Sequence, residues 1–121
     1  MEVTLKRIPE ADYMRLWKIG SSEANMSWTY RNGPFYNDYY TYKFDTFLKK
    51  FSFFKNSLNP GIYVDGVLVG IIFSTPHDDS FHTVELGIII YDDSYWHQGV
   101  GYTAISQWIS YLRVQHPEIV R

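Results

Sequence analysis

Two glycines, Gly99 and Gly101, open a predicted helix in the segment DDSYWHQGVGYTAISQWISYL, residues 92–112. Glycine in a helix interior costs about 1 kcal/mol relative to alanine, so either a sharp turn or a closely approaching ligand must favour it here. The first turn of a helix has unpaired amide N–H groups and a partial positive charge, to which phosphate groups bind readily. The spacing therefore indicates a site for a phosphate-bearing ligand. A tight strand-to-helix turn that binds nothing is the alternative.

Two familiar phosphate-binding motifs fit this segment poorly. GVGYTA matches the dinucleotide pattern G-x-G-x-x-A, but that pattern belongs between parallel strands and needs an acidic residue on the second of them. Antiparallel strands are predicted before Gly99, and the sequence ends where the second parallel strand would lie. No Lys-Ser or Lys-Thr pair follows the glycines, so the segment is not a P-loop.

The elements that position the glycines are predicted from hydrophobic periodicity. Residues 2–8 alternate weakly between apolar and polar and form a first strand. A helix follows from Pro9 to Gly20, with three apolar side chains on one face. A second helix is predicted over 39–55, and residues 21–38 have no clear period and form a loop. The apolar residues of the two helices are Tyr13, Leu16 and Trp17 in the first, and Phe44, Phe47, Leu48, Phe51 and Phe54 in the second.

A hairpin and a long strand lead into the glycine segment. GIYV and VLVGIIFS are rich in strand-forming residues and are joined by Asp65-Gly66, the pair favoured in a two-residue hairpin turn. FHTVELGIIIY forms a further strand, antiparallel to the preceding one. The helix after the glycines spans about 99–114. Its apolar stripe consists of Val100, Ala104, Trp108 and Tyr111, widened by Ile105, Ile109 and Leu112.

Composition limits the classes of protein to which the chain can belong. Its 121 residues, 45% of them apolar, suit one globular domain over residues 1–121. A formal net charge of −2 argues against nucleic-acid binding, which requires a basic surface. The chain has no cysteine, and hence no disulfide or thiolate site. No signal peptide or membrane-spanning stretch is recognisable, so we expect a cytoplasmic protein with no membrane partner.

The run VELGIIIYDDSYWHQGVGYTAI resembles motif A of the GNAT superfamily of N-acetyltransferases, a strand followed by R/Q-x-x-G-x-G/A and a helix. Gly99 and Gly101 occupy the two small positions, and Trp96 stands where Arg or Gln is commonest. Tyr-Trp followed by a polar residue and Gly-x-Gly is familiar in the branch that resembles ribosomal-protein N-terminal acetyltransferases. The order of elements resembles the N-terminal part of that fold. It implies a mixed, mostly antiparallel sheet flanked by helices, of the α+β type.

The resemblance implies that the chain binds acetyl-CoA as a co-substrate. The backbone of Ile88, Ile89 and Ile90 would pair with the pantetheine arm as an added strand does, and would supply a donor for the carbonyl oxygen. The loop would hold the pyrophosphate through Trp96 and the amides of six residues, namely His97, Gln98, Gly99, Val100, Gly101 and Tyr102.

Acetyl transfer also needs an acceptor for the amine proton. Glu85 stands where several relatives carry that carboxylate, often acting through water; a structural or ion-paired carboxylate is the alternative. Four aromatic residues in the predicted loop would wall the acceptor site, or else simply cover the edge of the sheet: Trp28, Tyr30, Phe35 and Tyr36. The segment HDDSFH, residues 77–82, contains groups that bind metals, but its Asp and Ser are ordinary turn residues, so no metal site is expected.

The resemblance therefore implies an N-acetyltransferase that acts on a primary amine, either a protein N-terminus or a small molecule. A non-catalytic coenzyme A-binding or interaction domain of the same fold is the alternative. Family members continue past the glycine-segment helix, so by analogy about the last third of the fold lies beyond Arg121. We expect the 121-residue chain to form homo-oligomers, either by pairing at the uncovered edge of the strand over 84–91 or by exchange of elements, and to have little or no activity alone.

Overall fold

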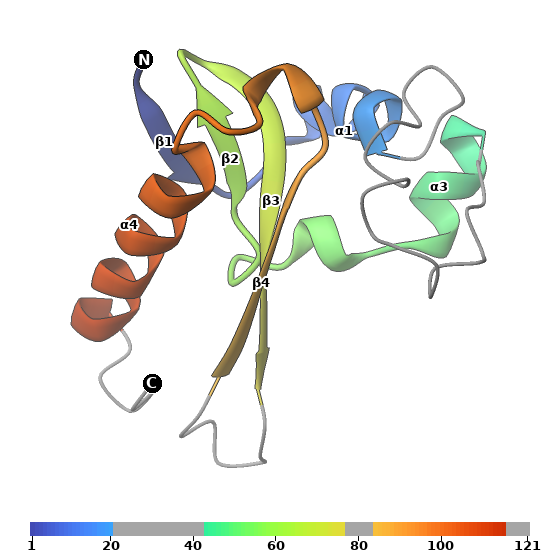
Figure 1. Cartoon of the computed structure of the whole chain (residues 1–121). Helices are drawn as coiled ribbons and strands as arrows, with labels where there is room; N and C mark the ends of the chain where they lie inside the picture. Colours follow the sequence, from blue (N-terminus) through green and yellow to red (C-terminus); the bar gives the residue numbers. More distant parts are fainter. Residues whose placement is uncertain (21–42, 77–83, 116–121) are drawn as a thin grey trace, which may run out of the picture.

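The computed structural model describes residues 1–20, 43–76 and 84–115. Their strands form one antiparallel sheet in the order β1 (Val3–Lys6), β2 (Gly61–Val64), β3 (Val67–Pro76) and β4 (Val84–Ile90). Helix α4 (Val100–Gln115) packs on one face, and α1 (Tyr13–Gly20) and α3 (Phe44–Lys50) lie on the other (Figure 1). The expected fold class is confirmed. No helix in these ranges is long and apolar enough to cross a membrane.

The predicted hairpin joins β2 to β3 through Asp65 and Gly66. Both residues have positive φ, 50° and 85° respectively, as a type I′ turn requires. A register shift between Ile62 and Tyr63 interrupts the pairing with β3. β3 is then long enough to pair with the whole of β4, from Gly70 opposite Ile90 to Pro76 opposite Val84.

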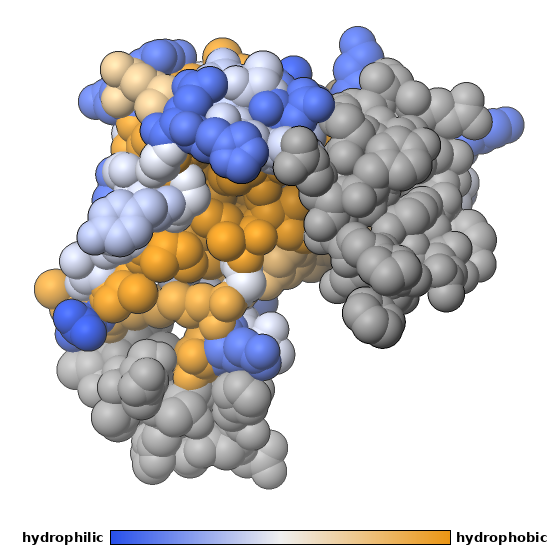
Figure 2. Space-filling view, viewed as in Figure 1, coloured by the Kyte–Doolittle hydropathy of each residue, from blue (hydrophilic) through white to orange (hydrophobic). Residues whose placement is uncertain are grey.

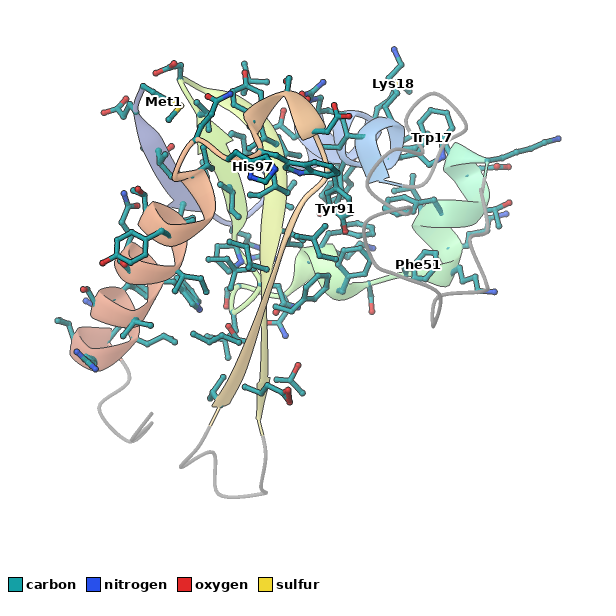
Figure 3. The ribbon with its side chains drawn as sticks, in the orientation of Figure 1. Met1, Trp17, Lys18, Phe51, Tyr91 and His97 are labelled. Atoms are coloured by element: carbon teal, nitrogen blue, oxygen red, sulfur yellow. The ribbon has the colours of Figure 1, made fainter. Side chains whose placement is uncertain are left out.

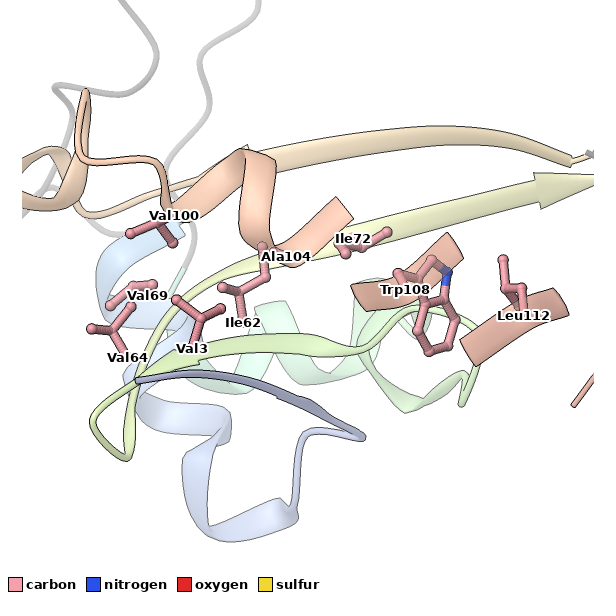
Figure 4. Close-up of a cluster of buried hydrophobic side chains, with 9 residues drawn as sticks. All are labelled: Val3, Ile62, Val64, Val69, Ile72, Val100, Ala104, Trp108 and Leu112. Atoms are coloured by element: carbon pink, nitrogen blue, oxygen red, sulfur yellow. The ribbon is translucent and has the colours of Figure 1, made fainter. Parts of the chain in front are cut away.

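Helix α4 is held on the sheet by one side chain in every fourth position. Val100, Ala104, Trp108 and Leu112 are buried against residues of β1, β2 and β3 (Figure 4). The prediction that Tyr111 belongs to this stripe is wrong, because Tyr111 is 48% exposed. Its ring instead stacks on Trp108, with 4.9 Å between centroids. A repeat of four keeps Leu112 facing the sheet and turns Tyr111 toward the outside.

The second predicted helix is shorter than expected. α3 ends at Lys50, Phe51 has extended backbone angles, and a separate 3₁₀ helix, η2 (Phe53–Lys55), follows. The break has a packing reason, because the rings of Phe47 and Phe54 stack at 5.1 Å. In one continuous helix these residues would lie about 10 Å apart along the axis. Interrupting the helix lets Phe54 fold back into the core on the α1 face. Residues 39–42 of the predicted helix lie outside the described residues.

Buried polar groups fix α4 and η2 to β3 near the end of that strand. The indole Nε1 of Trp108 donates to the hydroxyl of Ser74 at 2.9 Å. The backbone N–H of Ser74 in turn donates to Oδ1 of Asn59, whose Nδ2 donates to the carbonyl oxygen of Phe53. These bonds satisfy the polar atoms of Asn59 and Ser74, which are otherwise costly to bury.

Candidate functional site

The segment between β4 and α4, residues 91–99, is a loop, here called the glycine loop. A 3₁₀ helix, η3 (Asp93–Tyr95), begins it, and Oδ1 of Asp92 accepts hydrogen bonds from the backbone N–H and the hydroxyl of Ser94, at 3.1 and 2.6 Å. The side-chain amide of Gln98 donates to the carbonyl oxygen of Ser94 at 2.6 Å. The sequence folds this way locally because Asp and Ser side chains hydrogen-bond to nearby backbone groups in turns.

The two glycines that raised the question of a ligand serve different purposes. Gly99 has a φ of 79°, and an added Cβ would meet no atom within 4 Å, so it is required for its backbone angle. Gly101 lies inside α4, and its Cβ would meet Cδ1 of Ile88 at 3.7 Å, an ordinary contact. Gly101 therefore leaves space beside β4 that a larger side chain would fill. His97 also has positive φ, 63°, a conformation in which histidine is less unusual than most residues.

The loop borders a pocket of about 400 Å³, within the size range of small-molecule sites. Six of the residues predicted to bind the cofactor line it, together with Tyr95: Ile90, Trp96, His97, Gly99, Val100 and Gly101. Figure 3 shows His97 in the loop before α4 and Tyr91 just after the end of β4. Gln98 and Tyr102 do not line the pocket, and Tyr102 is 80% exposed. His97 and Gly99, on either side of Gln98, both have positive φ. In anion-binding nests, residues with such backbone angles turn successive N–H groups toward the same side.

The outer edge of β4 meets this pocket. Within the described ranges, β4 pairs only with β3. Tyr91 donates its N–H to the carbonyl oxygen of Val69, so alternate residues pair with β3 while Ile88 and Ile90 turn their N–H and C=O groups outward. The indole Nε1 of Trp96 confirms this orientation, because it donates to the carbonyl oxygen of Ile90 at 2.7 Å. By the same register the backbone of Ile89 faces β3.

The side chains along this edge are apolar. Leu86, Ile88 and Ile90 are partly buried against the core under α4. Figure 2 shows apolar side chains gathered between the loop and the lower part of α4. A chain that entered beside β4 would thus find backbone hydrogen-bonding groups and an apolar floor together.

Glu85 lies near the other end of β4, opposite Thr75. Its side chain is exposed and, by the alternation of the strand, lies on the face of the sheet away from α4. Glu85 and Ile90 are five positions apart, which corresponds to about 17 Å along a strand. The loop pocket and Glu85 therefore need a long, thin substrate if both are to act on it.

Tyr91 is buried where β4 meets α1, and burial raises the pKa of its hydroxyl well above the ordinary value. An added Cβ at Gly20 would meet the Tyr91 ring at 3.2 Å, so the end of α1 rests directly on this ring. Tyr91 stays protonated at neutral pH and packs the start of the glycine loop onto α1.

Sequence analysis missed two residues at the base of the loop, Arg15 and Asp92. Nη2 of Arg15 lies 3.3 Å from Oδ2 of Asp92, and Nε of Arg15 donates to the carbonyl oxygen of Leu68 at 2.9 Å. The Asp92-x-Ser94 spacing is a turn signal, and from it the role of Asp92 as the N-cap of η3 could have been predicted. The partner of Asp92 lies 77 residues away in the sequence, and no local pattern indicates it.

Several predicted site residues lie outside the described residues. They are the four aromatic residues expected at the acceptor site, Trp28, Tyr30, Phe35 and Tyr36, and the turn at 77–82. In the described ranges, no group of three or more histidines, cysteines or acidic residues could hold a metal ion.

Comparisons with known proteins identify the fold. A family model described as an acetyltransferase (GNAT) domain matches residues 2–120. The structure is similar to an acetyltransferase of the GNAT family from Bacillus anthracis, with a TM-score of 0.64 at 14% identity, covering 98% of this chain and 66% of that one. It is also similar to a domain from Methanocaldococcus jannaschii, with a TM-score of 0.64 at 16% identity, covering 95% of this chain and 72% of that one. The chain thus spans just under two thirds of the Bacillus structure. No curated protein sequence is a significant match.

Proposed function

Because the chain belongs to the acetyltransferase (GNAT) domain family, we propose that it binds acetyl-CoA and transfers the acetyl group to a primary amine. The observation that carries this proposal is the continuity of the loop pocket with the outward-facing backbone of β4. A diphosphate needs N–H donors and a positive end of a helix, and an extended arm needs a strand edge. The pocket supplies the first and β4 the second.

The diphosphate would lie in the pocket, against the amides of residues 97–101 at the start of α4. Gly101 leaves room for it, and Trp96 closes one side. The pantetheine arm would run along β4 and bond to the outward carbonyl oxygen of Ile88 and to the N–H of Ile90, which leaves the N–H of Ile88 for the thioester. The Ile90 carbonyl is already taken by Trp96. Of the three isoleucines, Ile88 and Ile90 would thus bond to the pantetheine arm through their backbone, whereas Ile89, whose backbone faces β3, would not.

Acetyl-CoA supplies a thioester carbonyl carbon, which the amine nitrogen attacks; the carbon–sulfur bond breaks and the sulfur leaves. Among the residues of this chain, Glu85 would accept the proton that the amine loses, directly or through water. An outward N–H on β4, such as that of Ile88, would donate to the carbonyl oxygen as it gains negative charge. The distance between the pocket and Glu85 suits a donor whose reactive group sits at the end of a long arm.

The acceptor is a protein N-terminus or a small amine. The Tyr95-Trp96 pair before the loop glycines favours the protein N-terminus, because it resembles the branch of the family that modifies ribosomal proteins. Trp28, Tyr30, Phe35 and Tyr36 remain the proposed walls of this acceptor site.

Two measurements, made one after the other, test the proposal. Calorimetric titration with acetyl-CoA should give saturable one-to-one binding, and adenosine 3′,5′-bisphosphate, which lacks both the pantetheine arm and the diphosphate, should bind much more weakly. Thiol release is then followed with peptides of varied N-terminal residue and with small amines. Absence of acetyl-CoA binding contradicts the proposal. In a chain long enough to be active, binding without turnover on any amine would instead favour a non-catalytic coenzyme A-binding domain.

A further inference from the structure

Besides the packing of Tyr91 on α1, a polar side chain, that of Arg15, attaches the glycine loop to the opposite side of the sheet. Arg15 lies on α1, which packs on the face away from α4. Its guanidinium group donates from Nη2 to Asp92 and from Nε to the carbonyl oxygen of Leu68. Arg15 thereby links α1, β3 and the start of the loop through two bonds of fixed relative geometry. A lysine ammonium, which is a point charge on a flexible stem, does not reproduce this fork.

Asp92 extends the link into the loop. While Oδ2 faces Arg15, Oδ1 accepts both hydrogen bonds from Ser94, and the carbonyl oxygen of Ser94 accepts from the side chain of Gln98. A continuous series of hydrogen bonds therefore runs from α1 to Gln98. This residue stands between His97 and Gly99, the two left-handed residues that line the pocket.

The surroundings make the link stronger than an ordinary surface ion pair. The side chains of Arg15 and Asp92 are 36% and 25% exposed, so water screens the two charges only in part. Each group also makes a second hydrogen bond that holds its orientation. Donors that are held in place before a ligand arrives bind it more tightly than donors that must first be ordered.

We propose that Arg15 is a positioning residue for acetyl-CoA binding: through Asp92 it fixes the geometry of the glycine loop, although it lies on the other face of the sheet. This inference rests on the proposed function, because acetyl-CoA is the ligand. It implies that any change in the position of α1 alters the affinity for acetyl-CoA.

The first test measures acetyl-CoA affinity by calorimetry. Arg15→Gln should raise the dissociation constant about tenfold, and Asp92→Asn should raise it to a similar extent. The double variant should bind no more weakly than either single one, because both remove the same link. Arg15→Lys, which keeps the charge but not the fork, should fall between Arg15→Gln and the wild type. Met14→Gln, at an exposed position on the same helix, is the matched control and should bind as the wild type does.

The second test needs no ligand. Amide hydrogen exchange of the free protein should become faster in Arg15→Gln at residues 94–99, and stay unchanged in α4 at residues 104–112. If the wild type binds no acetyl-CoA, the proposed function fails, while this measurement still tests whether Arg15 holds the loop. If Arg15→Gln does not fold, Asp92→Asn replaces it, since asparagine keeps an oxygen for Ser94. Wild-type affinity in both variants, or unchanged exchange in the loop, overturns the inference.

Discussion

The indole nitrogen of Trp96 donates a 2.7 Å hydrogen bond to the carbonyl oxygen of Ile90. Trp96 belongs to the glycine loop and Ile90 is the last residue of β4, so the loop folds back onto the edge of the strand that it has just left. This bond occupies the last outward carbonyl of β4 and closes one side of the loop pocket. Trp96 therefore has a structural role at the side of the pocket.

Trp96→Phe removes the N–H donor of this bond and part of the ring volume while keeping an aromatic ring. We expect the free energy of unfolding to fall by at least about 1 kcal/mol, the usual net value of one such bond. Acetyl-CoA should bind about fivefold more weakly, because the loop loses its attachment to β4. Tyr95→Phe keeps the ring of another pocket residue and is the control, with wild-type affinity expected. Calorimetric titration of both variants checks the prediction, and equal affinities would contradict it.

Gly101→Val tests the space that the pocket keeps beside β4. Valine is a better helix former than glycine, and its Cβ would meet only Cδ1 of Ile88 at an ordinary distance. The fold should therefore keep its melting temperature within a few degrees, while the temperature shift produced by acetyl-CoA is lost. Ser110→Val, at an exposed position on the same helix, should keep that shift. A full shift in Gly101→Val would show that no phosphate group comes close to this residue.

Substitutions at His97 and Gly99, the two loop residues with positive φ, test separately whether acetyl-CoA binding depends on the backbone conformation or on a side chain. Gly99→Ala forces a Cβ into a conformation that costs about 1–2 kcal/mol, and should weaken both the fold and acetyl-CoA binding. His97→Gly relieves the same kind of strain but makes the unfolded chain more flexible. We expect these effects to offset each other to within about 0.5 kcal/mol, with affinity unchanged. Urea unfolding and calorimetry measure both quantities. A large loss of affinity in His97→Gly would assign the binding to the imidazole instead of the amides.

Local signals were sufficient to predict most of the elements that carry the site. Asp65-Gly66 specifies its hairpin through the positive φ of two adjacent residues, and the fourfold spacing from Val100 to Trp108 specifies the buried face of α4. These features depend on residues close together in sequence. The glycine pair likewise indicated the loop. Only the structure shows that Gly99 is needed for its backbone angle, whereas Gly101 leaves space beside β4.

The features that sequence analysis missed depend on distant residues. The helix ends at Lys50 because the ring of Phe54 stacks on that of Phe47. The spacing of the phenylalanines also fits a continuous helix, so the sequence pattern did not indicate this break. The pair of Arg15 and Asp92 forms only when α1 and the end of β4 meet on the finished sheet. Which backbone groups of β4 point outward is set by its register with β3, and no periodicity of β4 alone determines it.

Glu85→Gln, made in a chain long enough to be active, tests the proposed base. The amide keeps the size of the carboxylate but cannot accept a proton at neutral pH, so the acetyl-transfer rate should fall by about 100-fold. Affinity for acetyl-CoA should stay within about twofold, because Glu85 lies far along β4 from the pocket. The acidic limb of the pH–rate profile should disappear with the carboxylate. Thr75→Val alters the residue opposite Glu85 and serves as a control for local disturbance of the strands. A wild-type rate at every pH would assign Glu85 a structural role.

Two buried tyrosines should make the fold sensitive to alkali. Burial raises the pKa of Tyr91, and burial together with the hydrogen bond to Asp12 and its charge raises the pKa of Tyr63. Below about pH 10 both tyrosines are protonated in the folded and in the unfolded chain, so their titration does not change the free energy of unfolding with pH. Above that pH the unfolded chain releases them first, and each tyrosine lowers the free energy of unfolding by about 1.4 kcal/mol per pH unit.

Tyr91→Phe removes one of these two contributions. Its stability should therefore fall less steeply than that of the wild type between about pH 10 and 12, whatever its stability at neutral pH. Tyr102→Phe, at an exposed position, is the control and should follow the wild-type slope. Urea unfolding at a series of alkaline pH values gives the three slopes directly. Parallel slopes in all three proteins would mean that the Tyr91 hydroxyl loses its proton as readily in the folded chain as in the unfolded one, and that the end of α1 does not seal it from water.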